Sequence, residues 1–298
     1  MKNKKVHLFL DSGAFSAFTQ KITINIQEYI AFIKEHQEYI DVYANLDAIG
    51  DPVQTLKNQR IMEDAGLKPL PCFHYGEPIS YLLRYLKNYE YIALGGMVPI
   101  STTELIKWLD ELYSNYFCEE ETGIVKVKIH GFGLTSLKLM LRYPWYSVDS
   151  TSWVVTGRLG SVLVPKFKSG QYQYLIDPWK VSISNRSPNQ KDAGQHLSTF
   201  SPFEQKIIHE YLDSKGFKVG HSEFRTESDK YKLKKGEKWN GKAANGKREV
   251  EVVIESGLCN DYKQRDELNI IYYLDLEKAI PPWPQPFKTK RRRGGFNL

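Results

Sequence analysis

The fold is decided at two short stretches, VHLFLDSGAF at residues 6–15 and YSVDST at residues 146–151. Each contains an apolar run of the kind that forms a buried strand, and the runs end on Asp11 and Asp149. When parallel strands close into a barrel, their carboxyl ends meet on one face, where barrel enzymes collect catalytic side chains. Two aspartates that are far apart in the chain are therefore expected in one site.

Between these stretches, strand-like and helix-like segments alternate with short joints, which is typical of repeated β-α units around a parallel sheet. We expect strands at 6–12, 41–48, 68–74, 91–94, 125–129 and 145–149. We expect helices at 26–36, 52–65, 79–89, 101–117 and 134–141. Six such units in about 150 residues predict an α/β fold, a TIM-type (β/α)8 barrel.

The pattern weakens after Asp149, although a hairpin at 161–176 and a helix at 201–214 are expected. Residues 217–220 suggest another barrel strand, and 269–274 suggest a strand or part of a terminal helix. We expect a catalytic barrel over 1–224 and last barrel elements over 250–280. Residues 225–249 are rich in Lys, Gly and Asn, which indicates a disordered insertion or a basic loop that orders on its ligand. Residues 281–298 form a Pro-rich basic tail.

Charge is unevenly distributed along the chain. Residues 1–150 contain 15 Lys and Arg against 18 Asp and Glu, whereas residues 151–298 contain 26 against 17. The tail adds a cluster of three arginines, Arg291, Arg292 and Arg293. This split favours an acidic catalytic body beside a basic surface that meets nucleic acid, and the alternative is a solvated, lysine-rich surface.

The three cysteines, Cys72, Cys118 and Cys259, are widely spaced, which indicates neither a disulfide framework nor a cysteine zinc site. The N-terminus is basic, but the apolar run after it is too short for a signal peptide. No segment approaches the roughly 18 apolar residues of a membrane span. We therefore expect a soluble, cytoplasmic protein.

A short motif ends each expected strand. The motifs are Asp11-Ser12-Gly13-Ala14-Phe15, Leu46-Asp47-Ala48, Phe73-His74-Tyr75-Gly76, Ala93-Leu94-Gly95-Gly96, His130-Gly131-Phe132-Gly133 and Val148-Asp149. Each is weak by itself, because a glycine after a strand often only permits a tight turn. In this order they resemble the motifs of the tRNA-guanine transglycosylase superfamily, over about residues 6–160.

The resemblance implies a base exchange that breaks a glycosidic bond. It gives Asp149 the role of a nucleophile that attacks the anomeric carbon and forms a covalent sugar-enzyme intermediate. It gives Asp11 the role of general acid and base, which protonates the departing guanine and later deprotonates the incoming base. Asp47 would accept hydrogen bonds from guanine, or else form an Asx turn or cap the next helix, a role for which Asp51 competes.

The remaining candidates are also implied by the resemblance, and each has a structural alternative. Gly95 and Gly96 bring backbone against the base edge, or simply form a tight turn. Tyr75 stands where the family has glutamine. Either the Tyr75 hydroxyl or the side chain of His74 would therefore replace the contact that the glutamine amide makes with the base. His130 and Phe15 contact the base, or His130 assists proton transfer, or both rings are structural. Arg158 resembles an arginine that binds a backbone phosphate, and a surface salt bridge is its alternative.

The chain also departs from the family. It has no Cys-X-Cys-X-X-Cys zinc motif, so we expect no zinc subdomain, no metal and no cofactor. With its basic second half it is most similar to the phage and bacterial branch that replaces guanine in DNA with a 7-deazaguanine base. DNA and that base are the expected partners, in a phage-infected cell. The alternatives are exchange in tRNA, nucleoside hydrolysis, and a noncatalytic nucleic-acid-binding barrel.

Overall fold

A computed structural model describes residues 6–134, 136–186 and 195–287 of the chain. The chain divides into two compact units: unit 1 is Met1–Ser150 with Pro282–Leu298, and unit 2 is Thr151–Pro281. The division differs from the domain that the sequence analysis extended to residue 224. The boundary lies where the parallel β-α rhythm stops.

Unit 1 is a mixed α/β structure built on parallel strands, as predicted. The strands are β1 (Phe9–Leu10), β2 (Val42–Tyr43), β3 (Cys72–His74), β4 (Tyr91–Gly95), β5 (Lys128–Gly131) and β6 (Ser147–Val148). β1 pairs with β2, and β3 to β6 form a four-stranded sheet in chain order. A parallel bridge from Ala44 to Leu70 links the two groups. All six carboxyl ends therefore point the same way along neighbouring strands.

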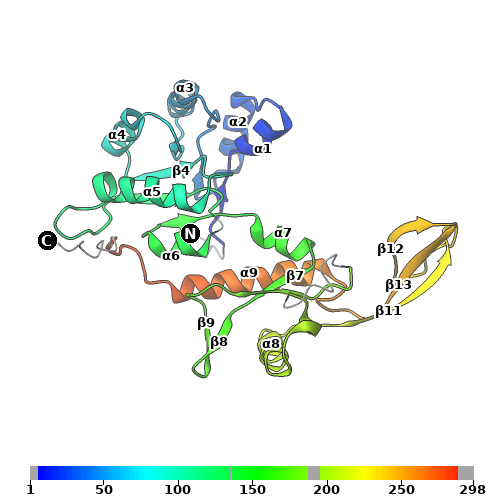
Figure 1. Cartoon of the computed structure of the whole chain (residues 1–298). Coiled ribbons are helices and arrows are strands. Elements are labelled where there is room, and N and C mark those ends of the chain that lie inside the picture. The colour runs from blue at the N-terminus through cyan, green and yellow to red at the C-terminus, as the bar shows by residue number, and fades with distance from the viewer. Residues whose placement is uncertain (1–5, 135, 187–194, 288–298) are drawn as a thin grey trace. The chain divides into compact units, whose positions relative to one another are not determined.

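Helices connect these strands (Figure 1). They are α1 (Ala14–Gln20), α2 (Ile26–His36), α3 (Pro52–Asp64), α4 (Ile79–Asn88), α5 (Thr102–Leu112) and α6 (Leu137–Arg142). α2 buries Tyr29, Ile30 and Ile33, the apolar face that its spacing predicts. The expected helix at 101–117 changes after Leu112 into a π-helical turn, Tyr113–Phe117, which buries both of its terminal rings.

The strands of unit 1 share an apolar cluster. Leu70, Cys72 and Ala93 are buried at its centre, and the partly buried Phe9, Val42, Tyr91 and Phe132 pack against them. The ring of Phe9 on β1 stacks on His130 of β5, with 4.2 Å between ring centroids. Side chains from the first strand thus reach the fifth, although β1 and β5 are not paired.

Unit 2 has a different topology. It contains α7 (Ser152–Arg158), β7 (Ser161–Val164), β8 (Lys166–Lys168), β9 (Gln171–Gln173), β10 (Trp179–Ser182), a 3-10 turn (Leu197–Thr199), α8 (Pro202–Ser214) and α9 (Tyr262–Ala279). A hairpin does lie within 161–176, but it joins β8 to β9, with positive φ at Ser169 and Gly170, whereas the strand 161–164 that was expected to form it pairs with β10. The hairpin reverses the chain, so β10 pairs antiparallel with β7 instead of extending a parallel sheet.

A second antiparallel sheet corrects the sequence analysis over residues 225–249. There the chain forms β11 (His221–Ser228), β12 (Glu237–Ala244) and β13 (Lys247–Glu255), in the order β11-β13-β12 (Figure 1). Residues 250–280, expected as barrel elements, belong to β13 and α9, and 217–220 is not a strand. Within the described ranges, no helix has the length and apolar character of a membrane span.

Candidate functional site

The predicted site residues of unit 1 gather at the carboxyl ends of its strands. Asp11 directly follows β1, and Asp149 directly follows β6. Asp47 comes four residues after β2, while His74 and Gly95 are the last residues of β3 and β4 and are paired in register. Because parallel strands end at a common edge, five separate motifs lie along one rim.

Asp11 interacts with both of the other rim aspartates. Although the residue is solvent-accessible, the protein around its carboxyl removes part of its hydration, and this raises the pKa of Asp11. Hydrogen bonds from the backbone of Gly13 and Ser12 oppose the shift, whereas the charges of Asp149 and Asp47 add to it. The net pKa is raised, so Asp11 is the carboxyl group that the rim drives toward its protonated form.

Asp149 is held by backbone and remains open to solvent. Its Oδ1 accepts a hydrogen bond of 2.6 Å from the backbone N–H of Gly133. Its Oδ2 lies 3.8 Å from Nε2 of His130, and its side chain is 40% exposed. A carboxylate fixed at one oxygen and accessible at the other is well suited to attack a bound electrophile.

His130 stands behind Asp149 in a buried position. Its Nδ1 lies 2.7 Å from the Ser147 hydroxyl, which lies 2.7 Å from the Tyr91 hydroxyl. Its Nε2 is buried and has no hydrogen-bond partner among the described residues. Because the Asp149 carboxylate faces Nε2, the tautomer with the proton on Nε2 is favoured, and Nδ1 then accepts from Ser147.

Asp47 belongs to a buried network rather than to a helix cap. Its Oδ2 lies 2.8 Å from Nε2 of His74, and its Oδ1 accepts a hydrogen bond of 3.1 Å from Ser12. Nδ1 of His74 lies 3.0 Å from Oε1 of Glu77, so the imidazole bridges two carboxyl groups. The cap of α3 is Asp51, whose carboxylate accepts from the backbone N–H of Gln54 at 2.9 Å. The structure therefore gives the cap of α3 to Asp51, and the role of Asp47 as an acceptor for guanine stays a prediction.

The bridging position favours the charged form of His74. Burial by itself lowers the pKa of His74, but the Cys72 sulfur and the hydrogen bonds to Asp47, Cys72 and Glu77 raise it by more. The net pKa lies well above the usual range of histidine. Burial raises the pKa of Cys72 to about 11, so its thiol is neutral at pH 7 and the two carboxylates hold the charge on His74 there.

These residues also have the ligand types of a metal site. A carboxylate oxygen of Asp47, the Cys72 sulfur and a ring nitrogen of His74 lie within 4.8 Å of one another. However, both ring nitrogens of His74 already face carboxylates. A metal ion would have to displace the bridging proton, and the sequence-based expectation of no metal stays a prediction.

The two glycines after β4 make room for protein groups. A Cβ at Gly95 would lie 2.7 Å from Cδ2 of His74 and 2.9 Å from the Cys72 sulfur. Gly96 has a φ of 68°, and its Cβ would lie 3.1 Å from the backbone nitrogen of Tyr75. The absence of side chains here lets His74 sit beneath the rim.

The other candidates are more scattered. Tyr75 packs edge-on against Trp108, with 5.3 Å between ring centroids, and Phe15 is 52% exposed on the first turn of α1. Arg158 lies in the last turn of α7, in unit 2. Arg291, Arg292 and Arg293 lie outside the described residues. The sequence analysis missed Glu77, three residues after His74, where the ring and carboxylate of an i, i+3 pair meet.

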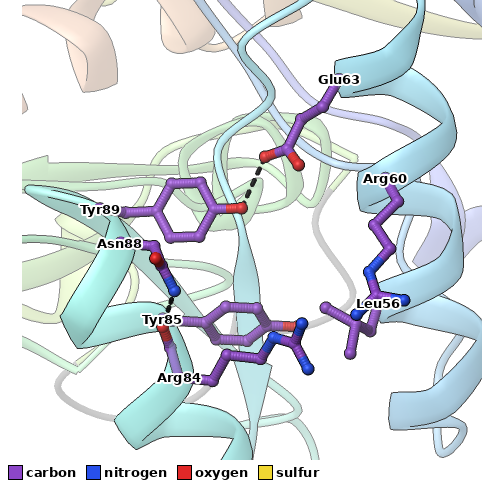
Figure 2. A pocket seen from close by; sticks show the side chains of 7 residues that line it. All are labelled: Leu56, Arg60, Glu63, Arg84, Tyr85, Asn88 and Tyr89. Carbon is purple, nitrogen blue, oxygen red and sulfur yellow. Dashed lines mark hydrogen bonds between the residues drawn. The ribbon is translucent and has the colours of Figure 1, made fainter.

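Unit 1 also has a cavity of about 380 Å³ whose lining includes none of these rim residues (Figure 2). Arg60 and Glu63 of α3 face Arg84 of α4 across it, and Glu63 accepts a hydrogen bond from the Tyr89 hydroxyl. These residues lie toward the carboxyl ends of their helices, which in a β-α unit adjoin the amino ends of the strands.

Asp11, Asp47 and Asp149 thus form one cluster of strand-end carboxyl groups in unit 1, and the charges of the last two affect the pKa of the first. The cluster holds a carboxyl group with a raised pKa, an accessible carboxylate fixed by backbone, and a buried imidazolium. Comparison of the chain with protein-family models, curated proteins and solved structures found no match.

Proposed function

We propose that the chain is a pentosyltransferase of the tRNA-guanine transglycosylase superfamily, which exchanges guanine in DNA for a 7-deazaguanine base. One observation carries the proposal: Asp11 and Asp149 end strands that are far apart in the chain, yet the pKa of Asp11, which burial raises, is raised further by the charge of Asp149. A carboxyl group with a raised pKa beside an accessible carboxylate is the pair that glycosidic base exchange requires.

The chemistry has two steps. The Asp149 carboxylate attacks the anomeric carbon of the target nucleotide, the glycosidic bond breaks, and its electron pair leaves with guanine, to which Asp11 gives a proton. The incoming base then gives a proton to Asp11, attacks the same carbon and displaces Asp149. Before the attack, the backbone N–H of Gly133 holds Oδ1 of Asp149, and Nε2 of His130 lies 3.8 Å from its Oδ2.

Recognition of the base falls to the Asp47 network in this proposal. A carboxylate accepts from the ring and amino donors of guanine, and Nε2 of His74 holds Asp47 in place at 2.8 Å from its Oδ2. His74 thus supports the Asp47 carboxylate, and the ring of Tyr75 packs against Trp108. A guanine inside a duplex must leave the stack to reach Asp149, so an extruded or single-stranded nucleotide is the substrate form.

We further propose that the six parallel strands of unit 1 curve as the strands of a TIM-type barrel do, although the described part of unit 2 adds no parallel strand to them. The stacking of Phe9 on His130 and the effect of the Asp149 charge on the pKa of Asp11 support this, because both indicate that β1 lies near β5 and β6. A flat sheet in the order β1 to β6 would separate β1 from β6 by roughly 24 Å, at about 4.8 Å per strand, and curvature is needed to bring their ends together.

The test supplies radiolabelled guanine or a 7-deazaguanine base with duplex DNA, single-stranded DNA or tRNA. We expect label in DNA, and a DNA-protein adduct that survives denaturation when the incoming base is omitted. Asp149→Ala should lose both the label and the adduct, and Asp11→Ala should lose the label. Asp64→Ala, which changes an exposed carboxylate at the end of α3, should retain both.

Other outcomes would point elsewhere. Label that enters only tRNA would place the chain in the RNA branch of the family. Release of free base without incorporation would indicate a nucleoside hydrolase. Binding of DNA by all variants, with neither label nor adduct, would replace the enzyme with a noncatalytic nucleic-acid-binding barrel.

A further inference from the structure

Unit 2 contains a cavity of about 630 Å³ that the rim of unit 1 does not include. It opens beside the end of α7 and the first turn of α9, and β12 contributes one side chain. Its polar and aromatic lining includes Arg158, Ser184, Arg186, Lys238, Tyr262 and Arg265. Four cationic side chains thus converge on one cavity, and no carboxylate is among its lining residues.

Arg265 is the most unusual of the four, because it is only 5% exposed. Its Nε donates to the carbonyl of Gly157 at 2.7 Å, and its Nη1 donates to the carbonyl of Leu258 at 2.5 Å. Nη2 makes no hydrogen bond to another described residue. A buried guanidinium normally has a carboxylate partner, and here two neutral carbonyls hold the group instead.

Nearby carboxylates do not neutralise the cavity. Glu251 is fully buried and pairs with Arg186 at 2.6 Å. Asp266 acts on Arg158 and Arg265 only through longer-range charge, and Asp261 caps α9 by accepting from the backbone N–H of Lys263. Four cations therefore face three carboxylates. Arg158 makes no hydrogen bond or ion pair with another described residue, so its guanidinium is available to a ligand.

The surroundings favour a polyanion over a small anion. Lys238 belongs to β12, and residues 225–249 of that sheet contain nine Lys and Arg against four Asp and Glu. The guanidinium of Arg248 on β13 lies 5.1 Å from the centre of the Trp239 ring on β12, so this sheet also places a planar cation beside an aromatic ring. A chain of phosphates that enters the cavity can continue along this basic sheet.

We propose that this cavity binds a backbone phosphate of a nucleic-acid strand through Arg158, Arg265 and Lys238. Guanidinium groups match phosphate oxygens with paired N–H donors, and the aromatic ring of Tyr262 offers a face for a neighbouring base. The inference deepens the proposed function, on which it rests for the identity of the polyanion. It adds an anchoring site in unit 2 that is separate from the rim residues.

The test measures the affinity of the full chain for a fluorescent single-stranded oligonucleotide by anisotropy, at several salt concentrations. The variant is Arg158→Gln/Lys238→Gln, which avoids Arg186 because its loss would leave Glu251 buried without a partner. The control is Arg60→Gln/Lys206→Gln, which removes the same two charge types from exposed positions on α3 and α8. We expect affinity to fall about 5- to 20-fold in the cavity variant and less than about twofold in the control.

Equal affinities in the two double variants would overturn the proposal. So would displacement of the oligonucleotide from the wild-type chain by micromolar deoxyguanosine monophosphate, since the cavity would then take a free nucleotide. Base exchange is assayed in parallel. If the wild-type chain shows no exchange but the cavity variant alone loses affinity, the phosphate site stands and the proposed enzyme activity fails.

Discussion

The pKa values of two rim residues, Asp11 and His74, are both raised, but by different kinds of neighbour. Asp11 loses hydration and faces Asp149 and Asp47, which favours its neutral form. His74 lies between Asp47 and Glu77, which favours its charged form. Asp47 is common to both sets, so it raises the pKa of Asp11 and of His74 together. The rim thereby holds a carboxyl group whose neutral form is favoured and an imidazole whose charged form is favoured, within one network.

Asp11→Asn is therefore expected to stabilise the protein while it abolishes exchange. A raised pKa in the folded state means that folding favours the protonated carboxyl, so the charged form at neutral pH costs stability. This cost is absent well below the ordinary pKa of 3.8 and grows as pH rises through the raised value. We expect the melting temperature at pH 7 to rise by about 1–3 °C.

Calorimetry at pH 7 and at acid pH checks this prediction. The gain should shrink as the pH falls, because the wild-type carboxyl becomes neutral as well. Asp64→Asn serves as the control and should change stability by less than about 0.5 kcal/mol at either pH. A gain that does not depend on pH would mean that the charge of Asp11 is not its source. For exchange, the rate should fall as pH rises through the raised pKa and Asp11 loses its proton.

At the scale of elements, the sequence predicted the strand ends better than the contacts made there. Apolar runs followed by Asp11, Asp47 and Asp149 marked the correct edge of the sheet, because the chemistry of a strand end is local. The bond from His74 to Asp47 joins residues 27 apart, and the bond from Gly133 to Asp149 joins residues 16 apart. Such contacts depend on strand register, which periodicity does not reveal.

The two aspartates near the start of α3 provide a matched pair for mutation. Asp51→Ala removes the cap of α3 and should lower the free energy of unfolding by about 1 kcal/mol, with exchange unchanged. Asp47→Asn keeps the shape of the side chain but offers an amide to the donors of guanine. It should lower kcat/KM by about 10- to 100-fold. Urea unfolding and the labelling assay, applied to both variants, distinguish capping from recognition.

If Asp51→Ala reduced exchange as much as Asp47→Asn, both effects would come from a displaced α3 and the recognition role of Asp47 would be lost. Unchanged exchange in Asp47→Asn would lead to the same conclusion. Residual activity in Asp47→Asn should not recover at lower pH, because an amide does not titrate there. The lack of recovery at low pH distinguishes Asp47→Asn from variants that only alter the charge of His74.

For the whole molecule, the sequence predicted the charge asymmetry but not the division of the chain. Unit 2 contains 21 Lys and Arg against 17 Asp and Glu, and its excess is concentrated in residues 225–249. Low hydrophobicity made that segment look like a loop or a disordered insertion. It forms strands because β13 lies between β11 and β12 and is hydrogen-bonded to both. The β propensity of one segment taken alone does not reveal this stabilisation.

The basic sheet should therefore contribute to the binding of nucleic acid through charge alone. The variant Lys232→Gln/Lys234→Gln/Lys235→Gln removes three exposed cations from the connection between β11 and β12. Each phosphate contact on a single strand adds about 0.7 to the slope of log affinity against log salt. We expect the slope to fall by about 1–2, with a similar loss for every oligonucleotide sequence, because phosphate contacts carry no base information.

The matched control is Lys34→Gln/Lys57→Gln/Lys87→Gln, which removes the same charge from exposed positions on α2, α3 and α4 of unit 1. If affinity depended only on net charge, the slope of log affinity against log salt would fall equally in the two triple variants. The sheet would then have no particular role in binding. A loss confined to the sheet variant, with exchange at saturating DNA unchanged, would show that β11 to β13 hold the strand while the rim performs the chemistry. A loss of exchange at saturating DNA in the sheet variant would instead mean that these lysines act beyond binding the strand.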